Sequence, residues 1–306
     1  MQMRPLGKTG IAIAPLVLGG NVFGWTADRE TSFALLDAFL DAGFNAIDTA
    51  DVYNRYAPGL QGGESETLIG DWMASRRCRD RVVLISKGGL PMGEGLEGLG
   101  EDYLPRACAA SLRRLGTDHI DVYLAHRSDP AVPIEETLAT FEALKAAGRI
   151  GHAGASNYSP AELAEALAAG DTYEVFQPQY NLVERASYEG PVEALCTAHG
   201  IGVVTYYALA AGFLTGKYRT PADLAGNRAR VAGAYLNDAG LAVLATLDRV
   251  AARHGATPAQ VALAWIMARP SVTAPIASAT SVAQLHDILA ATRLSLTAED
   301  LAELNA

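Results

Sequence analysis

The sequence predicts an α/β protein that folds as a closed (β/α)₈ TIM barrel. Two observations lead to this prediction. Eight short, β-rich apolar runs are each followed by a helical stretch, so strands and helices alternate along the chain. The runs are apolar throughout, as in parallel strands that helices cover on both faces. An open, doubly wound sheet is the alternative, and the count of eight strand–helix units favours the barrel.

The predicted elements follow one another in a regular order. The strands are expected at residues 16–19, 45–49, 82–87, 121–126, 150–155, 175–178, 202–206 and 274–277. The helices are expected at residues 28–42, 64–75, 102–115, 135–147, 160–169, 190–199, 240–254 and 281–291. In the helix at 135–147, apolar side chains recur on one face at Leu138, Phe141 and Leu144.

Helix-start signals support this order and add two elements. Ser159 and Thr257 each precede a proline and stand three residues before a glutamate or glutamine, which is typical of a capped helix start. Thr257 is therefore expected to open an extra helix before the last strand, and Thr297 a short C-terminal helix.

Two segments depart from the alternation. Residues 3–6 and 11–13 are typical of a hairpin that would close the bottom of the barrel. The long gap between strands seven and eight, residues 207–273, is expected to contain an inserted loop, and loops of such length are usually functional. No linker interrupts the chain, so a single domain over residues 1–306 is expected.

Composition narrows the class of protein. The 306 residues include 24 Lys or Arg and 34 Asp or Glu, a formal net charge of −10. Nucleic acid is not an expected partner, because little positive charge would offset its phosphates. Three scattered cysteines, Cys78, Cys108 and Cys196, form neither a disulfide framework nor a zinc site. With no targeting or membrane segment recognised, we expect a cytoplasmic monomer or small homo-oligomer.

Residues 93–98 match the G-x-G-x-x-G pattern of dinucleotide-binding turns, but their context argues against that function. The pattern requires a strand directly before it and a helix that begins inside it. Here further glycines and a proline surround the motif, which is typical of a flexible loop. Glu94 and Glu97 would also repel a pyrophosphate.

Polar residues at the strand ends indicate where the chemistry lies. In a (β/α)₈ barrel the active site is at the carboxyl ends of the strands. Three consecutive strands end in Asp48, Lys87 and His126, and Tyr53 follows soon after Asp48. An ionisable side chain at the end of an apolar strand is energetically unfavourable unless it is paired with another group or serves a function such as catalysis. One such residue alone is more often structural. Ionisable residues at the ends of three consecutive strands, with Tyr53 close by, indicate an active site.

These residue types suit the reduction of a carbonyl group, and they need no metal. The pKa of free tyrosine, about 10, is too high for easy proton exchange near neutrality. Lys87 would lower the pKa of Tyr53, and Asp48 would hold Lys87 in place. Tyr53 would then act as general acid in reduction and as general base in oxidation, while His126 polarises the carbonyl oxygen.

At these residues the chain resembles the aldo-keto reductase family, nearly from end to end. The resemblance rests on residues 43–50 (GFNAIDTA) with Tyr53, 63–66 (GESE), 86–87 (SK), 121–126 (DVYLAH), 154–157 (GASN) and 177–181 (QPQYN). Each motif is weak alone, and together they are specific. The resemblance implies a barrel that binds an extended nicotinamide cofactor. It also implies a catalytic tetrad, at Asp48, Tyr53, Lys87 and His126.

The resemblance implies cofactor contacts as well. Ser156, Asn157 and Gln177 would hold the nicotinamide carboxamide, and Tyr206 would stack on the ring. Residues 209–218 resemble the family's cofactor-covering loop. In that loop Leu209 would cover the cofactor and Lys217 would pair with the pyrophosphate.

Two departures from the family pattern concern the cofactor. Tyr207 stands where the family usually has a serine. After strand eight, residues 278–284 lack the family's frequent Lys or Arg, and Asp287-Ile288 replaces a Glu-Asn pair. NADP remains the expected cofactor, with NAD as the alternative, because neutral side chains can still bind a 2′-phosphate with help from a nearby arginine. These candidate side chains are Ser278, Thr280 and Gln284, with Arg228 or Arg230 as the arginine.

The substrate is expected to be a small carbonyl compound or a sugar. Phe23, Trp25 and Tyr56 follow strands one and two and would form an aromatic wall, which suits a sugar ring or an aryl aldehyde. Few residues follow the last barrel helix, so an open pocket is expected.

Two other functions compete with the reductase hypothesis. One is a cofactor-sensing binding subunit, resembling the potassium-channel β subunits that share this barrel; the presence of all four tetrad residues favours an enzyme. The other is an aldolase that forms a Schiff base on Lys87. That chemistry requires a depressed lysine pKa in an apolar pocket, whereas Asp48 would keep Lys87 charged.

Overall fold

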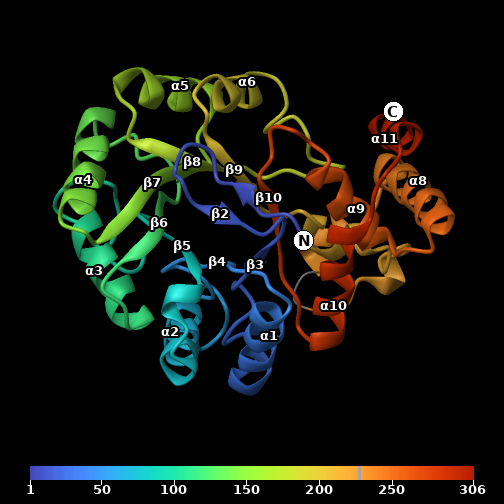
Figure 1. Ribbon diagram of the computed structural model, residues 1–306, viewed down its shortest axis with the longest axis horizontal. Helices are drawn as coiled ribbons and strands as arrows, with labels where there is room; N and C mark the ends of the chain where they lie inside the picture. Colours follow the sequence, from blue (N-terminus) through green and yellow to red (C-terminus); the bar gives the residue numbers. More distant parts are fainter. Residues whose placement is uncertain (227–228) are drawn as a thin grey trace.

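The computed structural model describes residues 1–226 and 229–306. Its centre is a closed barrel of eight parallel strands in the order β10-β3-β4-β5-β6-β7-β8-β9 (Figure 1). The strands are β3 (Val17–Gly19), β4 (Ala46–Asp48), β5 (Val83–Gly88), β6 (Ile120–Ala125), β7 (Ile150–Ser156), β8 (Tyr173–Gln177), β9 (Gly202–Thr205) and β10 (Ala274–Ala277). The predicted barrel is therefore confirmed, and the open sheet is wrong.

Helices surround the barrel as the alternation predicts (Figure 1). They are α1 (Arg29–Asp41), α2 (Glu64–Arg76), α3 (Leu104–Leu115), α4 (Ile134–Ala146), α5 (Pro160–Ala169), α6 (Pro191–Ala198), α7 (Ala229–Gly233), α8 (Asp238–His254), α9 (Pro258–Met267), α10 (Val282–Ala290) and α11 (Ala298–Asn305). Short 3₁₀ turns are η1 (Arg79–Arg81), η2 (Ala210–Thr215), η3 (Pro221–Asp223) and η4 (Ala291–Arg293). Because η2, η3 and α7 to α9 all lie between β9 and β10, the inserted region is largely helical.

The predicted helix starts are capped as their sequences indicate. Ser159, Thr257 and Thr297 each accept a hydrogen bond from the backbone three residues on, and the side chain there returns one. Such a reciprocal box satisfies backbone donors that a helix start otherwise leaves unpaired.

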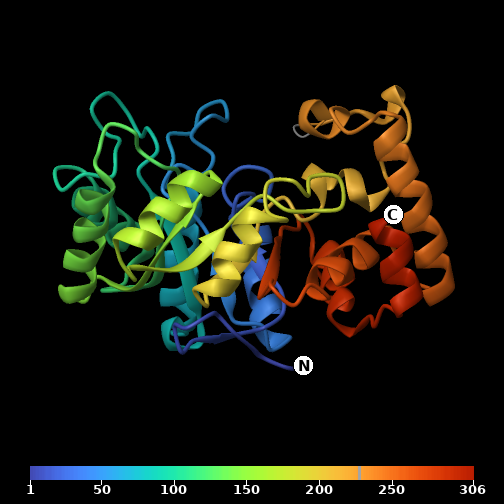
Figure 2. The ribbon, with the colours of Figure 1, turned by 90° about the horizontal axis from the view of Figure 1, so that it is seen from above.

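An antiparallel hairpin of β1 (Arg4–Pro5) and β2 (Ala12–Ile13) closes one end of the barrel, as predicted. Figure 2 shows this hairpin at one end and the long connections that follow the strands at the other. At Gly7, φ is +56°, and an added Cβ would lie 2.2 Å from the Gly202 nitrogen. Only glycine allows the hairpin to approach the barrel this closely.

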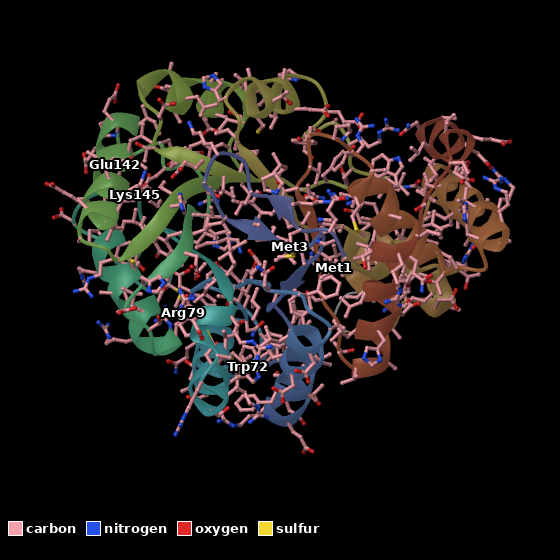
Figure 3. The ribbon with its side chains drawn as sticks, viewed as in Figure 1. Met1, Met3, Trp72, Arg79, Glu142 and Lys145 are labelled. Atoms are coloured by element: carbon pink, nitrogen blue, oxygen red, sulfur yellow. The ribbon has the colours of Figure 1, made fainter. Side chains whose placement is uncertain are left out.

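Apolar side chains fill the barrel and the layer between strands and helices. Leu6 and Ile13 of the hairpin region pack with strand residues inside the barrel. Trp72 and Trp265 are fully buried in the outer layer. Trp72 lies on the side of α2 that faces α1 (Figure 3), and its indole N–H donates to Asp37 at 2.8 Å. The two helices are thus joined by both packing and a hydrogen bond.

The three cysteines are buried and unbridged. None of the helices in the described residues is long and apolar enough to cross a membrane.

Candidate active site

Asp48, Tyr53 and Lys87 form a closed hydrogen-bonded triangle at the carboxyl end of β4 and β5. Lys87 Nζ donates to Asp48 Oδ1 at 2.7 Å and to Tyr53 Oη at 2.8 Å. The Tyr53 hydroxyl donates to Asp48 Oδ2 at 2.8 Å. The third lysine proton is donated to the Thr49 carbonyl at 2.8 Å. The predicted pairing of Asp48 with Lys87 is present, and all three ammonium donors of Lys87 are satisfied.

Burial controls the proton affinities in this triangle. Lys87 is 1% exposed, and burial lowers the pKa of its ammonium despite the Asp48 charge. The pKa of Tyr53 lies well above its usual value, because burial and then the carboxylate of Asp48 disfavour a phenolate. The net shift of this pKa is therefore upward, whereas the effect expected from Lys87 alone was a lowering. Tyr53 is held as a proton donor, which suits the reductive direction.

His126 follows β6, and its ring stands edge-on to Tyr53, with the ring centroids 6.1 Å apart. Burial lowers its pKa well below the usual value, and the charges of Lys87 and Arg127 act in the same direction. The imidazole is therefore neutral at physiological pH. A neutral imidazole carries one N–H and can donate it to a carbonyl oxygen.

Polar residues at the ends of β7, β8 and β9 are linked to this centre and to one another. Gln177 Nε2 donates to Asp48 Oδ1 at 2.8 Å, and Ser156 Oγ donates to the Gln177 carbonyl at 2.9 Å. Asn157 Nδ2 donates to the His126 carbonyl at 3.0 Å and its Oδ1 accepts from the Tyr206 hydroxyl at 2.6 Å. The network fixes the direction in which each amide and ring points.

A cavity of about 540 Å³ runs from this centre toward β10 and the inserted region. Most of the predicted site residues line it: Asp48, Tyr53, His126, Ser156, Asn157, Gln177, Tyr206, Leu209, Lys217, Ser278, Thr280 and Gln284. Lys87 lies behind Asp48 and Tyr53 and does not line the cavity. The structure thus brings the catalytic and cofactor candidates together around one space.

The part of the cavity next to β10 carries polar side chains beside the apolar Ile276 and Ile288. Ser278 Oγ donates to Asn21 Oδ1 at 2.7 Å, and Thr280 donates to Gln284 through both its backbone N–H and its hydroxyl. Lys217 supplies a cation there. Arg230 does not line the cavity, and the Arg228 hypothesis lies outside the described residues.

Asn21, Val22 and Ala259 line the cavity and were not expected from the sequence. Tyr207 and Asp287, noted only as departures from the family pattern, line it as well. Asn21 comes just after the end of β3, so the strand-end argument that found Asp48 could have found it. Gly212 and Thr215 belong to η2, inside the segment 209–218 that was expected to cover the cofactor, and both line the cavity.

The predicted aromatic wall is not part of this cavity. Phe23 is fully buried in the outer core, and its carbonyl accepts from Asn54 Nδ2 at 2.7 Å. Trp25 and Tyr56 are exposed and do not line the cavity. The expectation for Phe23 is wrong because its side chain packs in the outer core, where the adjacent Gly24 lies against Glu64 and Leu68 of α2.

Backbone strain gathers at the cavity wall. Asn157, Tyr207 and Ala211 line the cavity with φ values of 58°, 54° and 55°. Non-glycine residues in this left-handed region cost about 1–3 kcal/mol each and persist where surrounding structure enforces them. The Asn181 side chain supports one of these turns, since its Nδ2 donates to the Tyr207 carbonyl at 2.9 Å.

A comparison with protein families agrees with this geometry. The model of the aldo/keto reductase family matches residues 15–306, almost the whole chain. The protein belongs to the aldo/keto reductase family. The resemblance noted from the sequence motifs is thereby confirmed, and the protein is an oxidoreductase of a family that uses NAD(P)H.

Named relatives span enzymes and channel subunits. An uncharacterized oxidoreductase, YrpG, from Bacillus subtilis (strain 168) is 33% identical, over all of this chain and 95% of its own length. A probable voltage-gated potassium channel subunit beta from Arabidopsis thaliana is also 33% identical, over 94% of this chain and 90% of its own. The L-glyceraldehyde 3-phosphate reductase of Escherichia coli O157:H7 is 29% identical, over 100% of this chain and 92% of its own.

Proposed function

We propose that this aldo/keto reductase interconverts an aldehyde, a ketone or an aldose with the corresponding alcohol or lactone. Hydride would pass between NAD(P)H and the substrate, and Tyr53 would be the general acid and base. The observation that carries the proposal is the triangle of Asp48, Tyr53 and Lys87 at the wall of the cavity, beside the neutral ring of His126.

Each side chain has a separate part in the reduction. The His126 N–H would donate to the carbonyl oxygen and polarise it. A bound nicotinamide would supply the hydride to the carbonyl carbon. As charge develops on the oxygen, Tyr53 would give it the phenolic proton, and the Lys87 ammonium at 2.8 Å would stabilise the phenolate that remains. Oxidation of the alcohol would reverse each transfer.

The cavity fits a nicotinamide cofactor by its shape and its donors. It leads from the catalytic triangle to polar side chains near β10 and to Lys217. Ser156, Asn157 and Gln177 would hold the carboxamide end, and Tyr206 would stack on the ring. At Gly212, an added Cβ would lie 3.4 Å from Lys217 Nζ, so the glycine leaves the lysine room beside the cavity.

The distal side chains support NADP as the cofactor, with NAD as the alternative. Ser278, Thr280 and Gln284 offer hydroxyl and amide groups that can bind a 2′-phosphate, and Lys217 and Leu209 would cover the pyrophosphate. Asp287 lines the same region, and a carboxylate there would suit a free ribose hydroxyl instead. The kinetic preference between the two cofactors tests this assignment.

The remaining expectations extend the proposal. The substrate would be a small carbonyl compound or sugar, without a nucleic-acid or membrane partner. The protein would act in the cytoplasm, which is consistent with its unbridged cysteines. It would be a monomer or small homo-oligomer, with residues 1–306 as one domain.

Turnover with purified protein tests the proposal. The change in near-ultraviolet absorbance of the reduced cofactor is recorded with NADPH and with NADH against a panel of aldehydes, and in reverse against aldoses. We expect turnover with at least one pair. Cofactor binding without any turnover across the panel would contradict an enzymatic function.

A cofactor-sensing subunit is the second candidate, and the relatives named as potassium channel β subunits favour it. Slow turnover with tightly retained cofactor would support it. The Schiff-base aldolase has less support. Burial does lower the pKa of Lys87, but its side chain is 1% exposed and its three donors are engaged. A substrate carbonyl therefore lacks access to Nζ.

A further inference from the structure

One arginine joins the end of the segment 209–218 to α8. Arg219 Nη1 and Nη2 each donate to a carboxyl oxygen of Asp248 at 2.7 Å. The same guanidinium also reaches back toward η2, and its Nε donates to the Gly216 carbonyl at 2.7 Å. Arg219 therefore connects the residue that ends η2 to the middle of α8.

Gly216 makes this arrangement possible. Its φ is +78°, in the left-handed region, and an added Cβ would lie 2.6 Å from Arg219 Nη2. A side chain at position 216 would therefore strain the backbone and displace the guanidinium. The main chain is fixed as well, because the N–H groups of Arg219 and Thr220 donate to Asp223 Oδ2 at 2.9 and 2.7 Å. Both the backbone and the side chain of Arg219 are thus held in place.

Lys217 lines the cavity and stands two residues before Arg219. On the N-terminal side of Lys217, Phe213 and Leu214 are fully buried in the core. On its C-terminal side, Tyr218 is buried, and its ring centroid lies 4.8 Å from Lys217 Nζ. Lys217 is therefore held between side chains anchored in the core and the contacts that Arg219 makes with α8.

The contact between Arg219 and Asp248 lies at the surface, with side chains 39% and 45% exposed. A single exposed ion pair contributes little to the stability of a whole protein. Here, however, the planar guanidinium donates to both carboxyl oxygens and to a backbone carbonyl, and such a geometry is stronger and more directional than a lone contact. The pair is therefore suited to fixing one local segment rather than to stabilising the whole fold.

We propose that Arg219 and Asp248 form an anchor that attaches the end of the segment 209–218 to α8, and that Arg219 is a positioning residue for Lys217. With the anchor intact, Lys217 stays in the cavity wall, where it would pair with the pyrophosphate of a bound cofactor. The anchor thereby slows release of the cofactor, although neither anchor residue is among those that line the cavity. This consequence rests on the function proposed above, whereas the anchoring of the segment does not.

Hydrogen exchange of the cofactor-free protein, followed by mass spectrometry, tests the anchor without turnover. The N–H groups of Gly212, Leu214 and Gly216 are hydrogen-bonded within the segment, so their exchange reports its opening. Asp248→Asn keeps the size of the side chain and removes its charge. We expect these amides to exchange about three- to tenfold faster in Asp248→Asn than in wild type. Equal exchange rates in the two proteins would overturn the proposal.

Glu303→Gln is the matched control for this measurement. Glu303 of α11 pairs with Arg249 of α8 at 2.8 Å, and neither residue has a hydrogen bond or ion pair to the segment 209–218 among the described residues. This variant also removes a carboxylate that binds an arginine, on the same helix, so exchange in the segment should be unchanged. A similar acceleration in Glu303→Gln would mean that α8 loosens as a whole, and it would overturn the anchor.

The rate at which NADPH leaves the protein distinguishes an anchor from a simple charge effect. Asp248→Asn removes a negative charge, so electrostatic attraction alone would slow the release of an anionic cofactor. The anchor predicts the opposite, a release about three- to tenfold faster than in wild type. Stopped-flow fluorescence measures the rate when the NADPH complex is mixed with excess NADP⁺. Slower or unchanged release in Asp248→Asn would overturn the role of the anchor in cofactor retention.

Arg219→Lys separates the charge of Arg219 from its geometry. Lysine keeps the positive charge and cannot donate to both carboxyl oxygens and the carbonyl in the same fixed plane, so release should again be faster than in wild type. Release at the wild-type rate would mean that the charge alone acts. If the wild-type protein bound no cofactor, the proposed function would fail, and the exchange rates would still decide whether the anchor exists.

Discussion

The carboxylate of Asp48 and the amide of Gln177 are joined by a hydrogen bond of 2.8 Å, although 129 positions separate them in the sequence. Asp48 ends β4 and Gln177 ends β8, which stand four places apart in the ring of eight strands. The bond therefore spans the mouth of the barrel and ties the proposed proton-transfer group to a proposed carboxamide contact. Gln177 thus orients both the catalytic centre, through Asp48, and the cofactor end of the cavity.

Gln177→Leu should therefore weaken both catalysis and cofactor binding. Loss of a hydrogen bond to a charged group costs about 1.5–3 kcal/mol, so we expect kcat/KM to fall by about 10–100-fold. Gln179 provides the control, since it also lies near the barrel mouth but bonds to Tyr235 rather than Asp48. If Gln177→Leu matched wild type in both kcat and cofactor affinity, the bond across the barrel would have no functional part.

Two variants distinguish the contribution of the Tyr206 ring to cofactor binding from the contribution of its hydroxyl. Tyr206→Phe keeps a stacking ring and loses the 2.6 Å bond to Asn157, so cofactor affinity should fall only several-fold. Tyr206→Ala removes the ring and should weaken binding by about tenfold more. Fluorescence titration with NADPH measures both affinities. Equal affinities for the two variants would argue against stacking on Tyr206.

The ion pair of Glu66 and Arg114 should matter for stability rather than for binding. The Glu66 side chain is fully buried, so Arg114→Ala would leave its charge unpaired, at a cost of about 3–5 kcal/mol in the free energy of unfolding. Arg29→Ala breaks the exposed pair with Asp71 and should cost at most about 1 kcal/mol. Urea denaturation compares the two. Similar losses in both variants would mean that Glu66 is not buried as an ion.

Stability should also depend on pH through Asp51. Burial, and then the negative charge of Glu66, raises its pKa to about 8 in the folded protein, against about 3.9 in an unfolded chain, so the unfolded state ionises first as pH rises. The contribution of Asp51 to stability is complete below about pH 4 and is lost as pH rises toward 8. Asp51→Asn does not titrate, so its advantage over wild type should grow by on the order of 3 kcal/mol between pH 5 and pH 7.5.

That difference is measured by urea denaturation of both proteins at the two pH values, because titrations common to both cancel. Asp80 is exposed on η1, so Asp80→Asn should keep a constant difference from wild type. A constant difference for Asp51→Asn as well would mean that Asp51 ionises alike in the folded and unfolded chains.

Local patterns predicted much of this architecture. Apolar runs located the eight strands, and capping residues such as Ser159 and Thr257 located helix starts, because both signals act over a few residues. The strand-end argument placed Asp48, Lys87 and His126 together, since parallel strands in a barrel present their carboxyl ends on one face.

Tertiary contacts account for what the sequence argument missed. Phe23 is buried because its loop packs on distant helices, which no local pattern reports. The pKa of Tyr53 rises because burial and the Asp48 carboxylate disfavour the phenolate. Neither carboxyl oxygen of Asp51 has a hydrogen-bond partner among the described residues, and Arg114, from a helix later in the chain, pairs with Glu66 instead.

Comparison of Tyr53→Phe with wild type tests the central claim most directly. The substitution removes the proposed proton donor and keeps the ring beside Lys87. With saturating cofactor, we expect the single-turnover rate of carbonyl reduction to fall by about 10²–10⁴-fold, while cofactor affinity stays within about twofold. A single-turnover rate in Tyr53→Phe close to that of wild type would contradict the assignment of Tyr53 as the general acid.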